Sequence, residues 1–436
     1  MLATGWRTAL AGAAYSTLLR LATPLYLARL WWRGAREPGY RVALAERLAL
    51  GGPAQTPGAL WLHAVSLGET KAAAVLIDAL RARQPDLRLL LTHGTATGRA
   101  AGRALLREGD RQTWLPLDTP GAVRRFLQQH RPALGVLMET EVWPNLLQAA
   151  ETAGVPIVLA NARLSERSAR RGERFAALLR PAAQRITLAL AQTEDDARRL
   201  RQAGVPQVEV AGNLKYDLRA DAALLARGQA WRARPGRPVL AMTNTRDGEE
   251  ARLLAAWRQT AWRGPAPLLL IVPRHPQRFD AVAALVAQAG LSLSRRSAWG
   301  EAGPDGAACG AEVWLGDSLG EMSAYYGAAD LALLGGSFEP LGGHNLIESA
   351  ACGCPIVLGP STFNFADAAE RALAEGAAWR AADLPQALAW AAELLADAPR
   401  LTGAARAAQA FSARHRGAAE RMAGRIEALF TSPAAR

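Results

Sequence analysis

From residue 59 onward the sequence alternates short apolar segments with helical ones, and this regularity constrains the fold more than any other feature. Strands that are apolar along their whole length and separated by helices are typical of a parallel sheet covered on both faces. We therefore expect an α/β protein built on doubly wound, Rossmann-like sheets. The expected strands are residues 59–65, 87–93, 113–117, 133–138, 155–160, 186–192, 208–211, 239–242, 267–272, 291–294, 312–315, 330–334 and 355–358.

These strands fall into two series that are separated by a helical segment and the run Arg-Pro-Gly-Arg-Pro at 234–238, which is typical of a break. At 436 residues the chain is also too long for one ordinary core. We expect an N-terminal membrane-associated segment, two Rossmann-like domains that face a crevice, and a C-terminal helix that could cross back to the first domain. Their expected bounds are 1–36, 37–225, 226–410 and 411–436.

The net charge of +12 calls for an anionic partner or surface, although a GC-rich genome would also enrich arginine. Nucleic acid, anionic lipid and phosphorylated substrates all fit this charge. No nucleic-acid-binding motif occurs, and basic and aromatic residues do not interleave, so we expect no nucleic-acid partner. Cys309, Cys352 and Cys354 match no zinc motif, and we expect thiols that are buried or incidental, in a reducing compartment.

The N-terminal residues 8–28 are apolar, but Arg20 and Pro24 interrupt them. The interruption argues against a cleaved signal peptide and against a standard membrane-spanning helix. Tryptophan and arginine follow at residues 29–36, as at a membrane interface. We expect a short or tilted anchor with this border on the cytoplasmic side, and the alternative is a helix that packs on the protein itself.

Residues 333–359, LLGGSFEPLGGHNLIESAACGCPIVLG, have the character of a nucleotide-sugar site that follows a strand. Two glycine pairs lead to a helix expected to open at His344 and Asn345, and such a helix N-terminus attracts an anion. Glu348 would share a helix face with His344 and could accept hydrogen bonds from ribose hydroxyls. Glycine turns and a first-turn acid without a ligand are the alternative. The candidate residues are Gly335, Gly336, Ser337, Phe338, Gly342, Gly343, His344, Asn345 and Glu348.

Arg274 and His275 stand between two prolines, directly after the expected strand 267–272. Arginine suits bidentate recognition of phosphate, so Arg274 and the helix start at Asn345 would clamp one phosphate from two sides. His275 could instead be a structural hydrogen-bonding residue.

Polar residues also follow the strands of the first series, at the edge where an open α/β sheet binds ligands. Glu69 at a helix start could act as a general base, or could only complement the helix dipole. Arg163 and Lys215 would place positive charge in the crevice, where phosphate or carboxylate could bind. Ser165 is an ordinary N-cap residue. The candidates in this region are His63, Ser66, Gly68, Glu69, Glu139, Glu141, Asn161, Arg163 and Lys215.

Taken together and in this order, seven segments resemble the 3-deoxy-D-manno-octulosonic acid (Kdo) transferases of Gram-negative bacteria. The resemblance runs from about residue 38 to beyond residue 365. The segments are HAVSLGE, ETEVWPN, NARLS, GNLKYD, PRHP, GEMSAYYGAAD and GGSFEPLGGHNLIE.

The resemblance implies a GT-B glycosyltransferase that moves Kdo from CMP-Kdo to the lipid A precursor, with inversion, at the cytoplasmic face of the inner membrane. It implies that Glu69 deprotonates the acceptor hydroxyl, and that Arg274, His275, the 335–345 loop and Glu348 bind CMP. No metal and no cofactor are implied.

The chain departs from the family pattern at two positions. Arg246 stands where the family typically has a histidine, and it could serve the donor's anionic groups instead; Ser349 stands where a proline is usual.

Two other functions fit the same residues: transfer of a different nucleotide sugar, and a membrane-bound scaffold that keeps the fold without catalysis. Retention of Glu69 and of the whole 335–348 loop argues against the scaffold.

Overall fold

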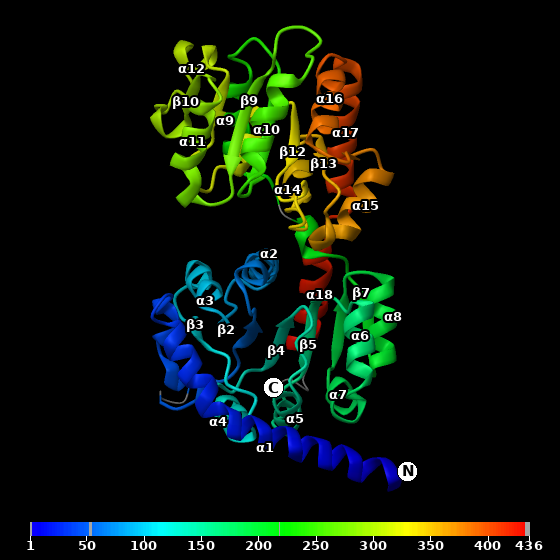
Figure 1. Cartoon of the computed structure of the whole chain (residues 1–436). Helices are drawn as coiled ribbons and strands as arrows, with labels where there is room; N and C mark the ends of the chain where they lie inside the picture. The colour runs from blue at the N-terminus through cyan, green and yellow to red at the C-terminus, as the bar shows by residue number, and fades with distance from the viewer. Residues whose placement is uncertain (1, 52–54, 218, 432–436) are drawn as a thin grey trace. The chain divides into compact units, whose positions relative to one another are not determined.

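The structure is a computed structural model that describes residues 2–51, 55–217 and 219–431 (Figure 1). Contacts divide the chain into two units, Met1–Asp217 with Arg416–Arg436 (unit 1) and Leu218–His415 (unit 2). The division therefore precedes the expected boundary at 225/226. The reason is a close crossing of α9 (Ala222–Arg232) and α13 (Met322–Ala328) within unit 2, where a Cβ on Gly228 would meet the carbonyl oxygen of Ala324 at 2.0 Å.

Unit 1 is built on a parallel seven-stranded sheet with the order β3-β2-β1-β4-β5-β6-β7. Most of its strands are buried on both faces, which is why they read as continuous apolar runs. Its strands are β1 Leu60–His63, β2 Leu89–His93, β3 Arg111–Trp114, β4 Leu134–Met138, β5 Ile157–Ala162, β6 Leu188–Ala191 and β7 Val208–Val210. Its helices are α1 Leu2–Arg33, α2 Leu67–Arg83, α3 Ala96–Gly102, α4 Pro120–His130, α5 Pro144–Thr152, α6 Glu166–Glu173, α7 Ala176–Ala183, α8 Glu194–Ala203 and α18 Ala418–Phe430, with 3₁₀ turns at Pro38–Arg41, Leu44–Leu48, Arg103–Leu105 and η4 Leu214–Asp217.

Two apolar cores cover the two faces of this sheet. One includes α2 and the last helix, α18, whose residues Met422 and Ile426 are fully buried there. The other lies under α4, α5, α7 and α8. The chain therefore returns to unit 1 at its end, and Asp217 fixes that return by accepting hydrogen bonds from the backbone N–H groups of Gly417 and Ala419.

Unit 2 has a second parallel seven-stranded sheet, with the order β10-β11-β9-β8-β12-β13-β14. The expected α/β class with doubly wound sheets is confirmed, and β14 is an addition to the expected strands. The strands are β8 Val239–Thr245, β9 Leu268–Pro273, β10 Leu293–Arg295, β11 Val313–Leu315, β12 Leu331–Leu334, β13 Ile356–Leu358 and β14 Ala378–Arg380. The remaining helices are α10 Glu249–Gln259, α11 Phe279–Gln288, α12 Gly306–Gly310, α14 Leu346–Ala351, α15 Ala366–Ala374, α16 Leu384–Leu395 and α17 Ala398–Arg414, with 3₁₀ turns at Pro276–Arg278, Arg296–Ala298 and Phe363–Phe365.

The direction of winding reverses in the middle of each sheet, between β1 and β4 in unit 1 and between β8 and β12 in unit 2. Both pairs of strands are parallel neighbours, so the loops after them leave the same edge of the sheet. Open α/β sheets bind ligands outside the carboxyl ends of their strands at such a point.

The N-terminal helix α1 lies against unit 1 through one face (Figure 1). The hydroxyl of Tyr15 donates to the buried Asp118 at 2.9 Å, and Ser16 donates to the side chain of Asn145 at 2.9 Å. The opposite face exposes large apolar side chains, with Leu25 76% and Trp32 84% exposed. We call this row the leucine stripe: Leu10, Leu18, Leu21, Leu25 and Trp32.

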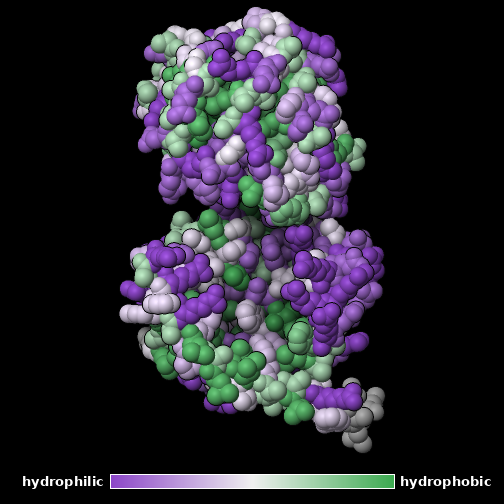
Figure 2. Space-filling model, in the orientation of Figure 1, coloured by the Kyte–Doolittle hydropathy of each residue, from purple (hydrophilic) through white to green (hydrophobic). Residues whose placement is uncertain are grey.

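Hydrophobic residues gather along the edge of unit 1 where α1 runs (Figure 2). Within the described residues, no helix combines the length and the apolarity that crossing a membrane requires. One face of α1 therefore packs on the protein, as the alternative interpretation expects. The leucine stripe on the other face is exposed and could contact another surface. As expected, the thiols of Cys352 and Cys354 are buried.

Candidate functional site

Glu69 stands in the first turn of α2, at the point of unit 1 where the winding reverses. Ser66 caps this helix by accepting from the N–H of Glu69, and the Glu69 carboxylate accepts from the N–H of Val65 at 2.8 Å and from the hydroxyl of Ser66 at 3.0 Å. This arrangement resembles a capping box, so Glu69 has a structural role whatever else it does. Burial, followed by the charge of Glu139, raises the pKa of its carboxyl.

Two more carboxylates follow β4 and share the electrostatic environment of Glu69. Glu139 has a left-handed backbone with φ 58°, and Glu141 accepts a hydrogen bond from the indole of Trp143 at 2.6 Å. Burial first, and then the charges of Glu69 and Glu139, raise the pKa of Glu141 to about 7. These three residues form what we call the acidic cluster. A carboxyl whose pKa lies near the working pH suits proton transfer.

Two cations lie at the same edge of the sheet, Arg163 after β5 and Lys215 in η4 after β7. Burial lowers the pKa of Lys215, the charge of Glu139 raises it, and the charge of Arg163 lowers it further. Lys215 is therefore close to both an acid and a second cation. The structure thus brings together Glu69, Glu139, Glu141, Arg163 and Lys215, which the sequence places on four separate loops.

The expectation that His63 and Asn161 contact a ligand needs correction, because both side chains are fully buried. Burial lowers the pKa of His63 to about 3, so its ring is neutral, and Nδ1 contacts the hydroxyl oxygen of Thr92 at 3.0 Å. The side-chain oxygen of Asn161 accepts from the N–H of Leu214 at 3.0 Å. Both side chains lie inside the protein and hold neighbouring segments in place at this edge of the sheet. Ser66 is the helix cap, and a Cβ on the exposed Gly68 would meet only ordinary contacts.

In unit 2 the buried Glu249 hydrogen-bonds to the backbone of the loop after β12, a role that the sequence analysis did not assign to it. Both carboxylate oxygens of Glu249, at the start of α10, accept from the N–H of Gly336 at 2.8 Å, and one accepts from the N–H of Arg246 at 2.8 Å. Gly335 lies so close to β8 that a Cβ there would meet the carbonyl oxygens of Thr243 and Asn244 at 2.6 Å. The signal available in the sequence was an acid directly after a strand and a glycine.

The rest of this loop is fixed by short-range contacts. Gly336, Gly342 and Gly343 all have positive φ, which favours glycine. Ser337 is fully buried, and its hydroxyl donates to the carbonyl of Leu334 and accepts from the N–H of Gly359 at 2.8 Å. The expectation that Ser337 binds the donor directly is therefore corrected to a structural role, whereas Phe338 is only partly buried.

Helix α14 begins at Leu346, with Asn345 as its N-cap residue accepting from the N–H of Ile347 at 3.1 Å. His344 therefore lies before the helix, and the expectation that His344 and Glu348 share a helix face was wrong. The Asn345 side chain donates to one carboxylate oxygen of Glu348 at 3.4 Å, so these two residues do lie together. The other carboxylate oxygen of Glu348 accepts no hydrogen bond within the described residues.

His344 is surrounded by positive charge. Burial first, and then Arg274, Arg246 and His275, lower the pKa of its ring to about 4. Neither the Arg246 nor the Arg274 guanidinium forms an ion pair within the described residues, and Arg274 and His275 are exposed. We call Arg246 and Arg274 the cationic cluster; burial and these two arginines lower the pKa of the adjacent His275. Unpaired guanidinium groups beside a glycine-rich loop form an anion-binding arrangement.

The chain has clear relatives. A family model described as 3-deoxy-D-manno-octulosonic-acid transferase (kdotransferase) matches residues 42–218. The 3-deoxy-D-manno-octulosonic acid transferase of Bordetella pertussis is 47% identical over 426 residues, which cover 95% of this chain and 98% of that protein. The chain belongs to the Kdo transferase family.

A second relative is the 3-deoxy-D-manno-octulosonic acid transferase of Haemophilus influenzae, which is 36% identical over 80% of this chain and 82% of its own length. The fold also matches Anabaena Alr3699/HepE in complex with UDP, with a TM-score of 0.57, 14% identity, and coverage of 86% of this chain and 100% of that chain. A UDP-GlcNAc 2-epimerase of Neisseria meningitidis has a TM-score of 0.54 at 14% identity, with coverage of 85% and 98%. These structures support the GT-B fold alone.

No cluster of three or more His, Cys, Asp or Glu side chains with the arrangement of a metal site occurs within residues 2–51, 55–217 and 219–431. The charged groups that this Kdo transferase places beside these loops are the acidic cluster with Arg163 and Lys215 in unit 1 and the cationic cluster in unit 2.

Proposed function

We propose that this protein transfers Kdo from CMP-Kdo to the lipid A precursor, lipid IVA, with inversion at the anomeric carbon. The observation that carries the proposal is the contrast in charge between the two places where the winding of a sheet reverses, β1/β4 in unit 1 and β8/β12 in unit 2. One has an acidic cluster in which the pKa of Glu141 is raised to about 7, beside two cations, and the other has unpaired guanidinium groups around a glycine-rich loop. A base is needed at the acceptor, and positive charge is needed at a departing phosphate.

In unit 1 the carboxylate of Glu69 takes the proton of an acceptor hydroxyl. The raised pKa of Glu69 makes this carboxylate a stronger base than an ordinary one, while its two hydrogen bonds from Val65 and Ser66 fix its orientation. The acceptor oxygen then attacks the anomeric carbon of Kdo, and the bond between that carbon and the CMP phosphate oxygen breaks. Arg163 and Lys215 bind phosphate on the acceptor, which carries two such groups.

In unit 2 the departing CMP phosphate carries the electron pair of the broken bond. Arg246 and Arg274 stabilise this charge, and the neutral His344 provides a polar contact beside it. Arg246 therefore takes over a position where the family usually has histidine. Glu348, oriented by Asn345, accepts hydrogen bonds from the ribose hydroxyls.

The acceptor is a lipid, and α1 supplies the surface that would meet it. The leucine stripe is exposed, and arginines 7, 20, 29 and 36 stand on the same helix or directly after it. An amphipathic helix with basic residues lies in the interface of an anionic membrane. We place the protein on the cytoplasmic face of the inner membrane, with the stripe in the lipid.

A transfer assay tests the proposal. Purified protein in detergent is given CMP-Kdo, generated in place, and tetraacylated lipid A precursor, and the products are weighed by mass spectrometry. An increase of one Kdo unit supports the proposal, and further increases count the additions. If the mass does not change, binding of CMP and UDP is measured next: CMP binding without transfer contradicts the acceptor, and a preference for UDP contradicts the donor.

A further inference from the structure

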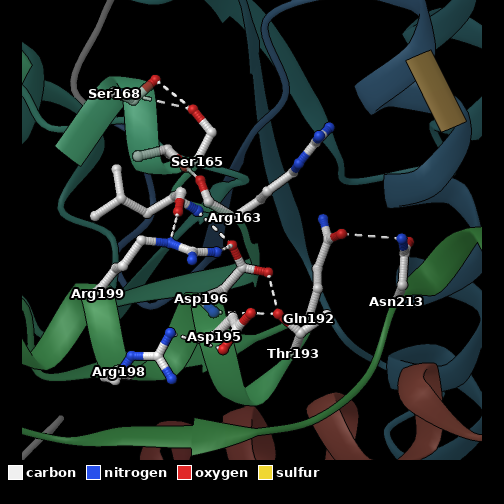
Figure 3. A network of polar contacts seen from close by, with 12 residues as sticks. Arg163, Ser165, Ser168, Gln192, Thr193, Asp195, Asp196, Arg198, Arg199 and Asn213 are labelled. Carbon is white, nitrogen blue, oxygen red and sulfur yellow. Dashed lines mark hydrogen bonds and ion pairs between the residues drawn. The ribbon is translucent and has the colours of Figure 1, made fainter. Parts of the chain in front are cut away.

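Asp196, in the first turn of α8, is a buried acid that no step of the proposed transfer uses. Its carboxylate accepts from the N–H of Leu164 at 2.9 Å, from the hydroxyl of Thr193 at 2.6 Å and from the guanidinium of Arg199 at 3.1 Å (Figure 3). Only 7% of its side chain is exposed. The next acid toward the N-terminus, Asp195, is 62% exposed and pairs with Arg198 at the surface.

The contacts of Asp196 converge on the backbone that carries Arg163. The N–H of Leu164 is bonded to Asp196, and the carbonyl of Leu164 accepts from Arg199. The carbonyl of Arg163 itself accepts from the hydroxyl of Thr140, in the loop after β4. Three side chains from two other segments therefore fix the orientation of two successive peptide groups.

The Arg163 side chain is left out of this network. It is exposed and extends away from Asp196 (Figure 3), and its guanidinium forms no hydrogen bond or ion pair within the described residues. Its charge still acts on Lys215, as described above. An arginine with a fixed backbone and an unpaired guanidinium group is preorganised for a ligand, because fewer conformations are lost when the ligand binds.

The second cation has a similar support. Gln192, two residues before the first residue of α8, donates to the carbonyl of Asn161 at 2.9 Å. It also accepts from the Asn213 side chain at 2.9 Å (Figure 3). Asn213 in turn accepts from the N–H of Lys215 at 3.0 Å. The segment 192–199 thus supports the backbone of both cations, so they are held relative to one another.

We propose that Asp196 is a positioning residue that aims the Arg163 guanidinium at a phosphate of the acceptor. This inference rests on the proposed function, since it takes the acceptor to be phosphorylated. Asp196 itself touches no substrate. It acts by holding the Leu164 peptide, whose N–H would otherwise be left without its partner, so that the loop after β5 would lose its single conformation.

The test compares Asp196→Ala with Asp195→Ala, a matched control that removes an acid from the same helical turn. We expect Asp196→Ala to raise KM for the phosphorylated acceptor about tenfold to a hundredfold, with kcat changed much less. Asp195→Ala is expected to behave as the wild type. Asp196→Asn keeps an oxygen that can accept from Leu164 and should restore most of the affinity. With an acceptor stripped of its phosphates, Asp196→Ala and wild type should have the same KM.

A double-mutant cycle with Arg163→Ala separates positioning from a general loss of structure. If Asp196 acts through Arg163, adding Asp196→Ala to Arg163→Ala changes KM no further. The inference is overturned if the double mutant raises KM by the product of the two single-mutant factors. If Asp196→Ala does not fold, Arg199→Ala, which removes the contact to the Leu164 carbonyl, replaces it in the same cycle. An unchanged KM in Arg163→Ala alone overturns the phosphate-binding role of Arg163 in the proposed function; an effect of Arg163→Ala without one of Asp196→Ala overturns only the positioning role.

Discussion

Replacing Glu69 with glutamine separates the two roles that the structure gives to this residue. The carboxylate accepts from the N–H of Val65 and from the hydroxyl of Ser66, and it is also the proposed base. Glutamine keeps an oxygen for the N–H of Val65, and its amide group can donate to the Ser66 oxygen, because glutamine is tolerated at this position of a capping box. The free energy of unfolding should therefore change by less than about 1 kcal/mol.

The rate of transfer should change far more. Removal of a positioned general base costs on the order of 10²-fold to 10⁴-fold. We expect Glu69→Gln to lose transfer by this factor, with the affinity for CMP nearly unchanged because Glu69 belongs to unit 1. Product is measured by mass spectrometry under single-turnover conditions, CMP binding by calorimetry, and unfolding by urea titration of the same preparations.

Ser66→Ala is the matched control, since it breaks the cap of the same helix and leaves the carboxylate. It should cost about 1 kcal/mol of stability and little activity. The reasoning is refuted if Glu69→Gln keeps more than a tenth of the wild-type rate. It is equally refuted if Ser66→Ala loses as much activity as Glu69→Gln, because orientation of the helix start, rather than a base, would then be the cause.

Three further predictions concern other parts of the molecule. Burial and the charge of Glu69 raise the pKa of Glu141 from 4.5 to about 7, so its ionisation lowers the free energy of unfolding as pH rises through this interval. Glu141→Gln should remove up to about 3 kcal/mol of that loss between pH 4.5 and 8. Urea unfolding of mutant and wild type measures it, and parallel pH profiles of the two proteins would contradict the prediction. Glu348→Ala should weaken CMP binding, and an unchanged affinity in calorimetry would contradict the ribose contact. Changing Leu21 and Leu25 of the leucine stripe to serine should reduce flotation with anionic vesicles without altering thermal unfolding; unaltered flotation would exclude the stripe as the membrane contact.

Most strands could be predicted from the sequence because a strand in a two-sided parallel sheet is apolar along its whole length. β14, Ala378–Arg380, escaped prediction because it lies in an alanine-rich stretch, residues 377–382, and alanine is depleted in strands. The contact-based division at 217/218 also differs from the expected boundary at 225/226. The sequence shows that 222–232 is helical, but only the close approach of Gly228 to α13 shows which unit the helix joins.

The candidate site could be predicted in outline because polar residues that follow parallel strands gather at one edge of the sheet. Which of those residues face outward could not be predicted. His63, Asn161 and Ser337 follow the same rule as Glu69 and Arg163, but their side chains are enclosed by neighbouring segments. Asp196 and Glu249 were missed because each hydrogen-bonds to a loop that follows a different strand. Asp196 contacts Leu164, 32 residues away in sequence, and Glu249 contacts Gly336, 87 residues away.

The sequence by itself determined the alternation of elements, and with it two parallel sheets and the loops that carry polar residues, because hydrophobic periodicity is a local property of the chain. The tertiary structure decided which polar side chains are buried, which carboxyls and imidazoles have shifted pKa values, and which cations remain unpaired. Those properties depend on burial and on charges that distant segments contribute, such as Glu69 acting on Glu141 and Arg163 acting on Lys215.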